Sequence, residues 1–213
     1  MAAGFHTEQM IRHYPDLEGC LPDVQRAFSL LRECYRQGGQ VLLCGNGGSA
    51  ADSEHMVGEL MKGYLAKRPI SAWLRDRLLS AYPEHGAYLA DHLQGALPAI
   101  SLVSQTSLLT AYANDVAADM AFAQQVVGYG LEGDVLIGIS TSGNAANVLN
   151  ALQVARVLKV RTIGLTGRDG GKMKAFCDVA ICIPAENTPE IQQRHVVVYH
   201  TLCAMLEEEF FPS

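Results

Sequence analysis

The polar and apolar positions of this chain repeat one arrangement three times. A short apolar run is followed directly by a turn of small residues, and a segment with helical spacing comes next. The three apolar runs are QVLLC (40–44), DVLIGIS (134–140) and VRTIGLT (160–166), and their turns are GNGGSA, TSGNAA and GRDGGK. The first helical segment extends to about Leu65 and the second to about Leu158, whereas the third is short. Such alternation of buried strands and helices predicts a parallel sheet with helices on both faces.

Two further apolar runs extend the predicted sheet. We expect strands at Val179–Ile183, which Pro184 ends, and at Ala99–Val103. The predicted fold class is therefore α/β, a three-layer α/β/α sandwich around a central, mainly parallel sheet. Ligands of such folds bind beyond the carboxyl ends of the strands. Here those ends carry Gly, Ser, Thr and Asn.

Helical segments precede, interrupt and follow the sheet. An N-terminal segment (1–39) contains one helix at 23–37, which we expect Asp23 to cap and Gly38-Gly39 to end. Residues 68–98 form a helical insertion with two short amphipathic stretches around Pro83. We treat the whole chain, 1–213, as a single domain. The last helix (189–211) carries a stripe of packing residues and ends in an acidic run, 207–209, which we expect to be solvated; the stripe is Ile191, His195, Val198, Tyr199, Leu202 and Leu206.

Composition narrows the functional classes. The chain has 213 residues, 49% of them hydrophobic and 18% charged, and its net charge is −6. This acidic balance argues against a nucleic-acid partner. No apolar run is long enough for a membrane span, and no secretory signal is visible at the N-terminus. The six cysteines form no CxxC pair, so we expect reduced thiols in a cytoplasmic protein.

Two glycine–serine loops are the main candidates for ligand binding. Gly45–Ala50 follows one strand and Ser140–Asn144 follows another, and each opens a helix. Either loop alone is explained equally well as a tight turn with a helix cap. The first also fits the dinucleotide pattern GxGxxA, but no acidic residue for a ribose follows about 20 positions later. Two loops with hydroxyls and free N–H groups, and no adjacent lysine, favour a single phosphate monoester.

The order of these motifs resembles the sugar isomerase (SIS) domain family. The chain shows CGNGGSA, HMVGEL, AND (113–115), GDVLIGISTSGN, LTGRDGGKM and IQ…H in the family's order. Within the family the chain is most similar to the phosphoheptose isomerases, which interconvert sedoheptulose 7-phosphate and glycero-manno-heptose 7-phosphate. The resemblance implies a flavodoxin-like SIS fold, an isomerase activity, and a homotetramer whose active sites are shared between subunits.

A second group of residues has acid–base character. His55 and Glu59 are four residues apart on one predicted helix and so share a face, roughly opposite an apolar stripe of Val57, Leu60, Met61, Tyr64 and Leu65. Gln192 and His200 lie eight apart on the last helix. From the residues alone, the first pair could be a solvated face and His200 a packed histidine. The resemblance implies that Glu59 and His200 are the base and acid of isomerisation, and that His55, Glu59, Gln192 and His200 bind zinc in some members.

The resemblance also implies a substrate-binding set, drawn from both loops, from the AND motif and from the last helix. It comprises Asn46, Gly47, Gly48, Ser49, Asp115, Ser140, Thr141, Ser142, Asn144 and Gln192. Read without the family, Asp115 is equally a turn residue. Two departures place the particular sugar in question. Ala145 stands where the family often has serine, and the insertion 68–98 follows the helix of Glu59.

Three other functions compete with this one. A phosphosugar isomerase could act on another ketose phosphate. A non-catalytic SIS protein could bind a phosphosugar or a protein, as the replication-initiator-associating relatives do. Those relatives usually have an altered acid–base set, which is intact here. A dinucleotide-dependent oxidoreductase has only the GxGxxA pattern in its favour.

Overall fold

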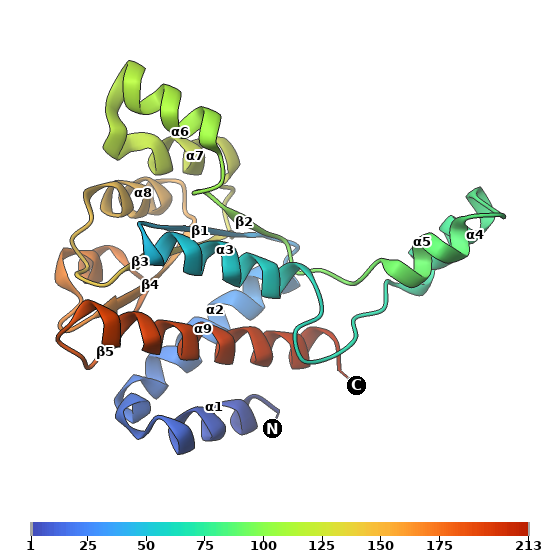
Figure 1. Cartoon of the computed structure of the whole chain (residues 1–213), viewed down its shortest axis with the longest axis horizontal. Coiled ribbons are helices and arrows are strands. Elements are labelled where there is room, and N and C mark those ends of the chain that lie inside the picture. The colour runs from blue at the N-terminus through green and yellow to red at the C-terminus, as the bar shows by residue number, and fades with distance from the viewer. Residues whose placement is uncertain (1, 213) are drawn as a thin grey trace.

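A computed structural model of the chain describes residues 2–212. Its centre is a five-stranded sheet in the order β2-β1-β3-β4-β5, and every neighbouring pair is parallel (Figure 1). The register pairs Val41 with both Ala99 and Val135. The strands are β1 (Val41–Gly45), β2 (Ala99–Ser101), β3 (Val135–Ser140), β4 (Arg161–Gly167) and β5 (Val179–Ile183). The predicted parallel sheet is confirmed, with β2 shorter than expected.

The three layers follow from alternation along the strands. In β1, Val41 and Leu43 pack with one hydrophobic cluster and Leu42 and Cys44 with the other. The first cluster is formed with α2, α3 and α9, and α1 packs on α9 outside them. The second is formed with α7 and α8. All residues of β1 and β3 are buried, because helices cover both faces of the sheet.

The helices carry the loops and side chains of the candidate site. Gly47 adopts a left-handed φ of 56° immediately before α3, and Gly143 a φ of 63° shortly before α8. These two turns reverse the chain directly at the carboxyl ends of β1 and β3. The helical segments are α1 (Ala2–His13), η1 (Pro15–Cys20), α2 (Leu21–Arg36), α3 (Gly48–Met61), α4 (Ala72–Ala81), α5 (Gly86–His92), α6 (Thr106–Tyr112), η2 (Ala113–Ala117), η3 (Ala118–Met120), α7 (Ala121–Tyr129), α8 (Ala146–Val157), η4 (Gly171–Phe176) and α9 (Thr188–Phe210).

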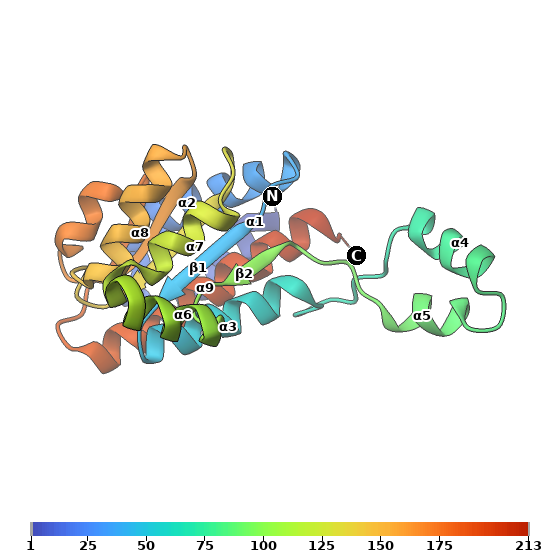
Figure 2. The ribbon, with the colours of Figure 1, turned by 90° about the horizontal axis from the view of Figure 1, so that it is seen from above.

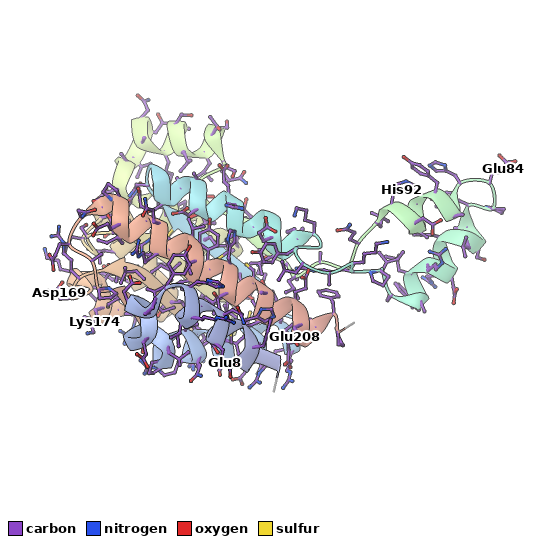
Figure 3. The ribbon with its side chains drawn as sticks, turned by 60° about the horizontal axis from the view of Figure 1, so that its bottom comes forward. Glu8, Glu84, His92, Asp169, Lys174 and Glu208 are labelled. Atoms are coloured by element: carbon purple, nitrogen blue, oxygen red, sulfur yellow. The ribbon has the colours of Figure 1, made fainter. Side chains whose placement is uncertain are left out.

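Helices α4 and α5 form an arm that extends away from the sheet and its covering helices (Figures 1 and 2). The predicted helical insertion is thus confirmed. No residue of α4 is buried, and the Trp73 side chain is 65% exposed. Glu84 and His92 are carried by the arm, far from Asp169 and Lys174 at the opposite end of the molecule (Figure 3). Within α4 and α5 only Gly86 and Ala90 are buried, so the arm adds little to the core.

Several local expectations were wrong. The N-terminal segment contains a second helix, α1, before α2. Asp23 lies inside the first turn of α2 and contacts Arg26, while the cap position belongs to Cys20. Helix α3 ends at Met61, four residues early. The short helix expected after the third strand is present, as a 3-10 helix.

The acidic end of the last helix is the largest correction. We expected residues 207–209 to be solvated, but Glu207 is buried. Its carboxylate accepts hydrogen bonds from the backbone N–H groups of Tyr64, Leu65 and Ala66 and from Arg68. Those donors belong to the segment that follows α3, so sequence distance concealed the partnership.

Candidate functional site

The first loop connects β1 to α3 and is hydrogen-bonded to α8, the helix that follows β3. Asn46 and Asn147 exchange two amide hydrogen bonds of 2.9 Å, which tie this loop to the start of α8. Ser49 is buried, and its N–H donates to the Asn46 carbonyl. A side chain at Gly45 would meet the Ser49 backbone at 2.6 Å, so the chain passes close over itself here. Gly47 and Gly48 lie exposed between these contacts and leave open backbone for a ligand.

The second loop, Ser140–Asn144, rests on the loop after β4. A Cβ at Gly143 would lie 2.1 Å from the Gly170 carbonyl oxygen, so only glycine fits this crossing. The Asn144 side chain accepts from the Lys172 N–H, and its amide donates to the Ser142 carbonyl. Ser140 is buried, Thr141 half-buried and Ser142 exposed. Solvent exposure therefore increases along the loop from Ser140 to Ser142.

His55, Glu59 and His200 meet where α3 packs against α9. His55 Nε2 lies 3.4 Å from Glu59 Oε1 and 3.4 Å from His200 Nε2. The Glu59 side chain is 12% exposed, and Lys62 Nζ lies 3.3 Å from its other oxygen. The spacing of His55 and Glu59 predicted a shared face, and the structure confirms it. Their contact with His200, 145 residues away, comes from the packing of α3 on α9.

The apolar stripe expected on α3 is confirmed in part, because Leu60 is buried and Val57 and Tyr64 pack against the core. Met56, Ser53 and Leu60 face the core, whereas Met61 is 46% exposed. Leu65, which lies beyond the end of the helix, is 65% exposed. Glu59 is itself buried beside Leu60, so the pair does not lie opposite the packed side. The buried side of α3 thus includes polar residues, which a helical wheel of hydrophobic positions does not predict.

The electrostatics of the cluster favour a neutral histidine. Burial lowers the pKa of His200, the neighbouring His55 lowers it further, and Glu59 acts in the opposite sense. A lowered pKa keeps the imidazole neutral at pH 7, with one N–H to donate and one lone pair to accept. His195, one turn earlier, is fully buried against the Thr166 carbonyl, and burial lowers its pKa to about 4. It remains a packing residue.

Aromatic and carboxylate side chains around the cluster escaped the sequence analysis. The Tyr64 ring stacks on His200 at a centroid distance of 5.3 Å. The Tyr199 hydroxyl lies 2.9 Å from His55 Nδ1 and 3.5 Å from Asp52 Oδ1. The only sequence signal was position: Asp52 precedes His55 by three residues, and Tyr199 adjoins His200. The sequence analysis assigned Tyr199 only to the packing stripe of the last helix and gave Asp52 no role.

Two candidate residues lie apart from the His–Glu cluster. The Gln192 amide packs on the first loop, where a Cβ added at Gly48 would lie 2.5 Å from its Nε2. Gln192 precedes His200 by eight residues, about 12 Å along α9. Asp115 is exposed on η2 and accepts a hydrogen bond from Asn114. The structure thus joins Gln192 to the first loop and places Asp115 against neither loop nor cluster.

A cleft of about 570 Å³ opens beside His200. Tyr64 and His200 line one side, and His6, Gln9 and His13 of α1 line the other. His200 is therefore reachable from the surface through this cleft.

Comparison with known proteins decides the family. The SIS domain matches residues 19–75 and 99–207. The phosphoheptose isomerase of Aliarcobacter butzleri is 42% identical over 186 residues, which cover 87% of this chain and 85% of that protein. That of Rhodospirillum rubrum is 41% identical over 192 residues, 90% of this chain and 88% of that protein. The chain belongs to the phosphoheptose isomerases of the SIS domain family.

Solved structures of phosphoheptose isomerases agree over the whole fold. The enzyme of Neisseria gonorrhoeae is 34% identical, with a TM-score of 0.74 and 96% of each chain covered. The enzyme of Francisella tularensis is 27% identical, with a TM-score of 0.76 and the same coverage. The two SIS domain matches leave out residues 76–98, which hold most of the arm. The two solved enzymes each cover 96% of this chain, which is too much to leave out the whole arm.

The donor set of this phosphoheptose isomerase family member only partly suits a metal. Within residues 2–212, no group of three or more His, Cys, Asp or Glu side chains is arranged to hold an ion. Two donor separations of 3.4 Å do match the edge of a tetrahedron with bonds of about 2.1 Å. The His55 and His200 rings, however, stand at 84° to each other. Lys62 also holds the second oxygen of Glu59.

Proposed function

We propose that this chain interconverts sedoheptulose 7-phosphate and glycero-manno-heptose 7-phosphate. The observation that carries the proposal is the convergence of Glu59, His55 and His200 at 3.4 Å on the same helix pair that carries the first loop. Aldose–ketose isomerisation needs a base for the carbon-bound proton and a group that exchanges protons with the oxygens, and a carboxylate beside a neutral imidazole provides both. The family membership places these groups in a phosphoheptose isomerase.

The distance between loop and cluster fits an extended substrate. His55 and Glu59 follow Gly48 by seven and eleven residues, about 10 and 16 Å along α3. A phosphate held at the loops would leave the cluster facing the far end of the molecule. The 7-phosphate of a heptose is remote from C1 and C2, where the reaction takes place. A short sugar phosphate would leave the cluster unused.

Each proton in the proposed reaction has a carrier. Glu59 removes the C1 proton of the ketose while the His200 N–H protonates the C2 carbonyl oxygen, which yields a 1,2-enediol. His200 then takes the O1 proton, and Glu59 returns its proton to C2, which yields the aldose. The C–H bond broken at C1 is replaced by one at C2, so no oxidant or reductant is consumed.

The phosphate is assigned to the loop hydroxyls and backbone. Ser142 is exposed at the tip of the second loop, Thr141 is half-buried, and the two glycines of the first loop lie exposed beside them in the fold. Backbone N–H groups at the start of a helix favour an anion. Ala145 removes one hydroxyl from this set, and these N–H groups compensate.

We also propose that zinc binds at His55, Glu59 and His200 after these side chains rotate toward a common point, since their present arrangement does not hold an ion. The two 3.4 Å separations support this, whereas Gln192 would have to leave Gly48 to become a fourth ligand. Bound zinc would supply positive charge for the oxygens of the enediol. Equilibrium dialysis with zinc, comparing the unmodified chain with H55A, tests the site. Equal binding by both would exclude it.

We further propose a cytoplasmic homotetramer with shared active sites. All six cysteines are free thiols, which suits a reducing compartment. Among residues 2–212, no helix has the length and apolarity to cross a membrane. The open cleft beside His200, bounded by α1, offers a place where a neighbouring subunit could complete the site. Analytical ultracentrifugation tests the assembly, and a monomer at micromolar concentration would refute it.

The decisive experiment is turnover followed by NMR. Purified protein with sedoheptulose 7-phosphate should give the aldose, and Glu59→Gln and His200→Ala should each abolish conversion. Glu54→Gln is the matched control, because Glu54 lies on the same helix but contacts Ser104 outside the cluster. Conversion that survives in Glu59→Gln would overturn the assignment. Binding of the sugar phosphate without conversion would favour a non-catalytic SIS protein or another substrate.

A further inference from the structure

Tyr199 connects His55 to the carboxylate of Asp52, to which no other side chain donates a hydrogen bond in the part of the chain that the structure describes. The Tyr199 hydroxyl lies 2.9 Å from His55 Nδ1 and 3.5 Å from Asp52 Oδ1. Tyr199 is fully buried in α9, while Asp52 and His55 come from α3. The second Asp52 oxygen is buried and has no hydrogen-bond partner among residues 2–212. Three side chains from two helices therefore form a chain that ends at the His–Glu cluster.

Counting the available protons shows in which direction the hydrogen bonds from His55 through Tyr199 to Asp52 run. An ionised Asp52 only accepts hydrogen bonds, and Tyr199 has a single hydroxyl proton. When that proton is donated to Asp52, the hydroxyl oxygen is left to accept from His55. His55 must then carry its proton on Nδ1, and its Nε2 presents a lone pair to Glu59 and His200. The opposite direction would leave both Asp52 oxygens without a donor.

We propose that Tyr199 and Asp52 are positioning residues that hold His55 as the tautomer protonated on Nδ1. The inference rests on the proposed role of the His55–Glu59–His200 cluster in moving substrate protons. With a lone pair on Nε2, His55 accepts from a sugar hydroxyl or binds a cation. With a proton there, it would donate to Glu59 Oε1, 3.4 Å away, and withdraw that oxygen from the substrate. The tautomer thus decides whether Glu59 is free to act.

The test is the tautomer itself, read by ¹⁵N NMR of the full chain labelled at histidine and treated with a chelator. The shifts of Nδ1 and Nε2 differ between tautomers, and H55A assigns the signals. We expect His55 to be protonated on Nδ1 in the unmodified chain. In Tyr199→Phe the preference should be lost, because the ring remains and only the acceptor oxygen is removed.

Asp52→Asn gives an independent second variant. The asparagine amide can donate to the Tyr199 oxygen, which turns the hydroxyl proton toward His55 Nδ1 and moves the His55 proton to Nε2. An Asp-to-Asn change beside a catalytic histidine stabilises the wrong tautomer in this way in serine proteases. Tyr64→Phe is the matched control. It removes the same hydroxyl from a ring stacked on His200, and it should leave the His55 tautomer unchanged.

Activity gives a second readout. We expect kcat to fall about 10- to 100-fold in Tyr199→Phe, as is usual when a partner of a functional histidine is lost, with KM changing little. A His55 proton on Nε2 in the unmodified chain, or a tautomer unchanged in both Tyr199→Phe and Asp52→Asn, would overturn the proposal. The NMR measurement needs no turnover. An inactive protein with the expected tautomer would therefore refute the isomerase assignment but would still support the role of Tyr199 and Asp52.

Discussion

Arg68 and Glu207 form a buried ion pair that fastens the end of helix α3, which carries Glu59, to α9. Arg68 Nε lies 2.7 Å from Glu207 Oε1, and the two side chains are 0% and 3% exposed. The remaining Arg68 nitrogens donate to the backbone carbonyls of Glu59 and Leu60. The Glu207 carboxylate also accepts hydrogen bonds from three backbone N–H groups of the turn after α3. The pair therefore fixes the backbone that carries Glu59.

Neutralising one partner should be costly. Glu207→Gln leaves the Arg68 guanidinium buried without its counter-charge, and we expect the free energy of unfolding to fall by about 3–5 kcal/mol. Urea denaturation measures this. Glu209→Gln is the control, since its partner Arg36 is more than half exposed. That change should cost less than about 1 kcal/mol. Equal losses in both variants would contradict the role given to the buried pair.

The same pair predicts a pH dependence of stability. Burial by itself raises the pKa of Glu207, but hydrogen bonds from Tyr64, Leu65 and Arg68 outweigh it and hold the pKa below its usual value. A carboxyl with a depressed folded pKa stabilises fully above the unfolded pKa of about 4.3 and loses this contribution as pH falls through the folded value. The stability gap between the unmodified chain and Glu207→Gln should be constant from pH 7 to 5 and narrow below. A gap that widens in acid would contradict this sign.

Gly143→Ala should damage the second loop specifically. The new Cβ would lie 2.1 Å from the Gly170 carbonyl oxygen, at a φ of 63° that strains alanine. Because the contact is with backbone, the loop itself must move, at a cost of about 1–3 kcal/mol. We expect KM for the sugar phosphate to rise about tenfold or more. Gly128→Ala, an exposed position of α7 with open space around it, should leave KM unchanged.

Ala145→Ser should improve both the helix and the loop. Ala145 occupies the cap position of α8 and forms no side-chain cap bond. Serine is favoured there, with a gain of about 0.5–1 kcal/mol expected in stability. The same hydroxyl would add a donor beside the phosphate, so KM should fall. Ala146→Ser, one residue into the helix, is the control and should give neither effect; a lower KM in both variants would contradict the assignment to position 145.

Trp73 should report on the arm alone. It is the single tryptophan of the chain and is 65% exposed, with the Arg77 guanidinium 5.0 Å from the ring centroid. We expect emission close to that of tryptophan in water and ready quenching by acrylamide, with Trp73→Phe as the dark control. A blue-shifted emission maximum, or a fluorescence yield per molecule that rises with protein concentration, would show that the arm is covered in the assembled protein.

Features that depend on short-range periodicity could be predicted from the sequence. Apolar runs such as 134–140 specified buried parallel strands, because both faces of each run must be covered. The turns after them placed glycines and hydroxyls at the carboxyl ends of β1 and β3. The four-residue spacing of His55 and Glu59 placed both on one face of α3. Each of these follows from bond geometry within a few residues.

Which distant groups meet could not be predicted, because it depends on how the helices pack. The packing of α3 on α9 brought His200 to His55 and placed Tyr199 against the other side of the same imidazole. It buried Glu207, whose acidic surroundings suggested solvent, because Arg68 and three backbone donors arrive from 139 or more residues away. It also kept Gln192 at the first loop, apart from the cluster. Periodicity tells which face of a helix is buried, but the partner that covers it is set by how the helices pack across the sheet.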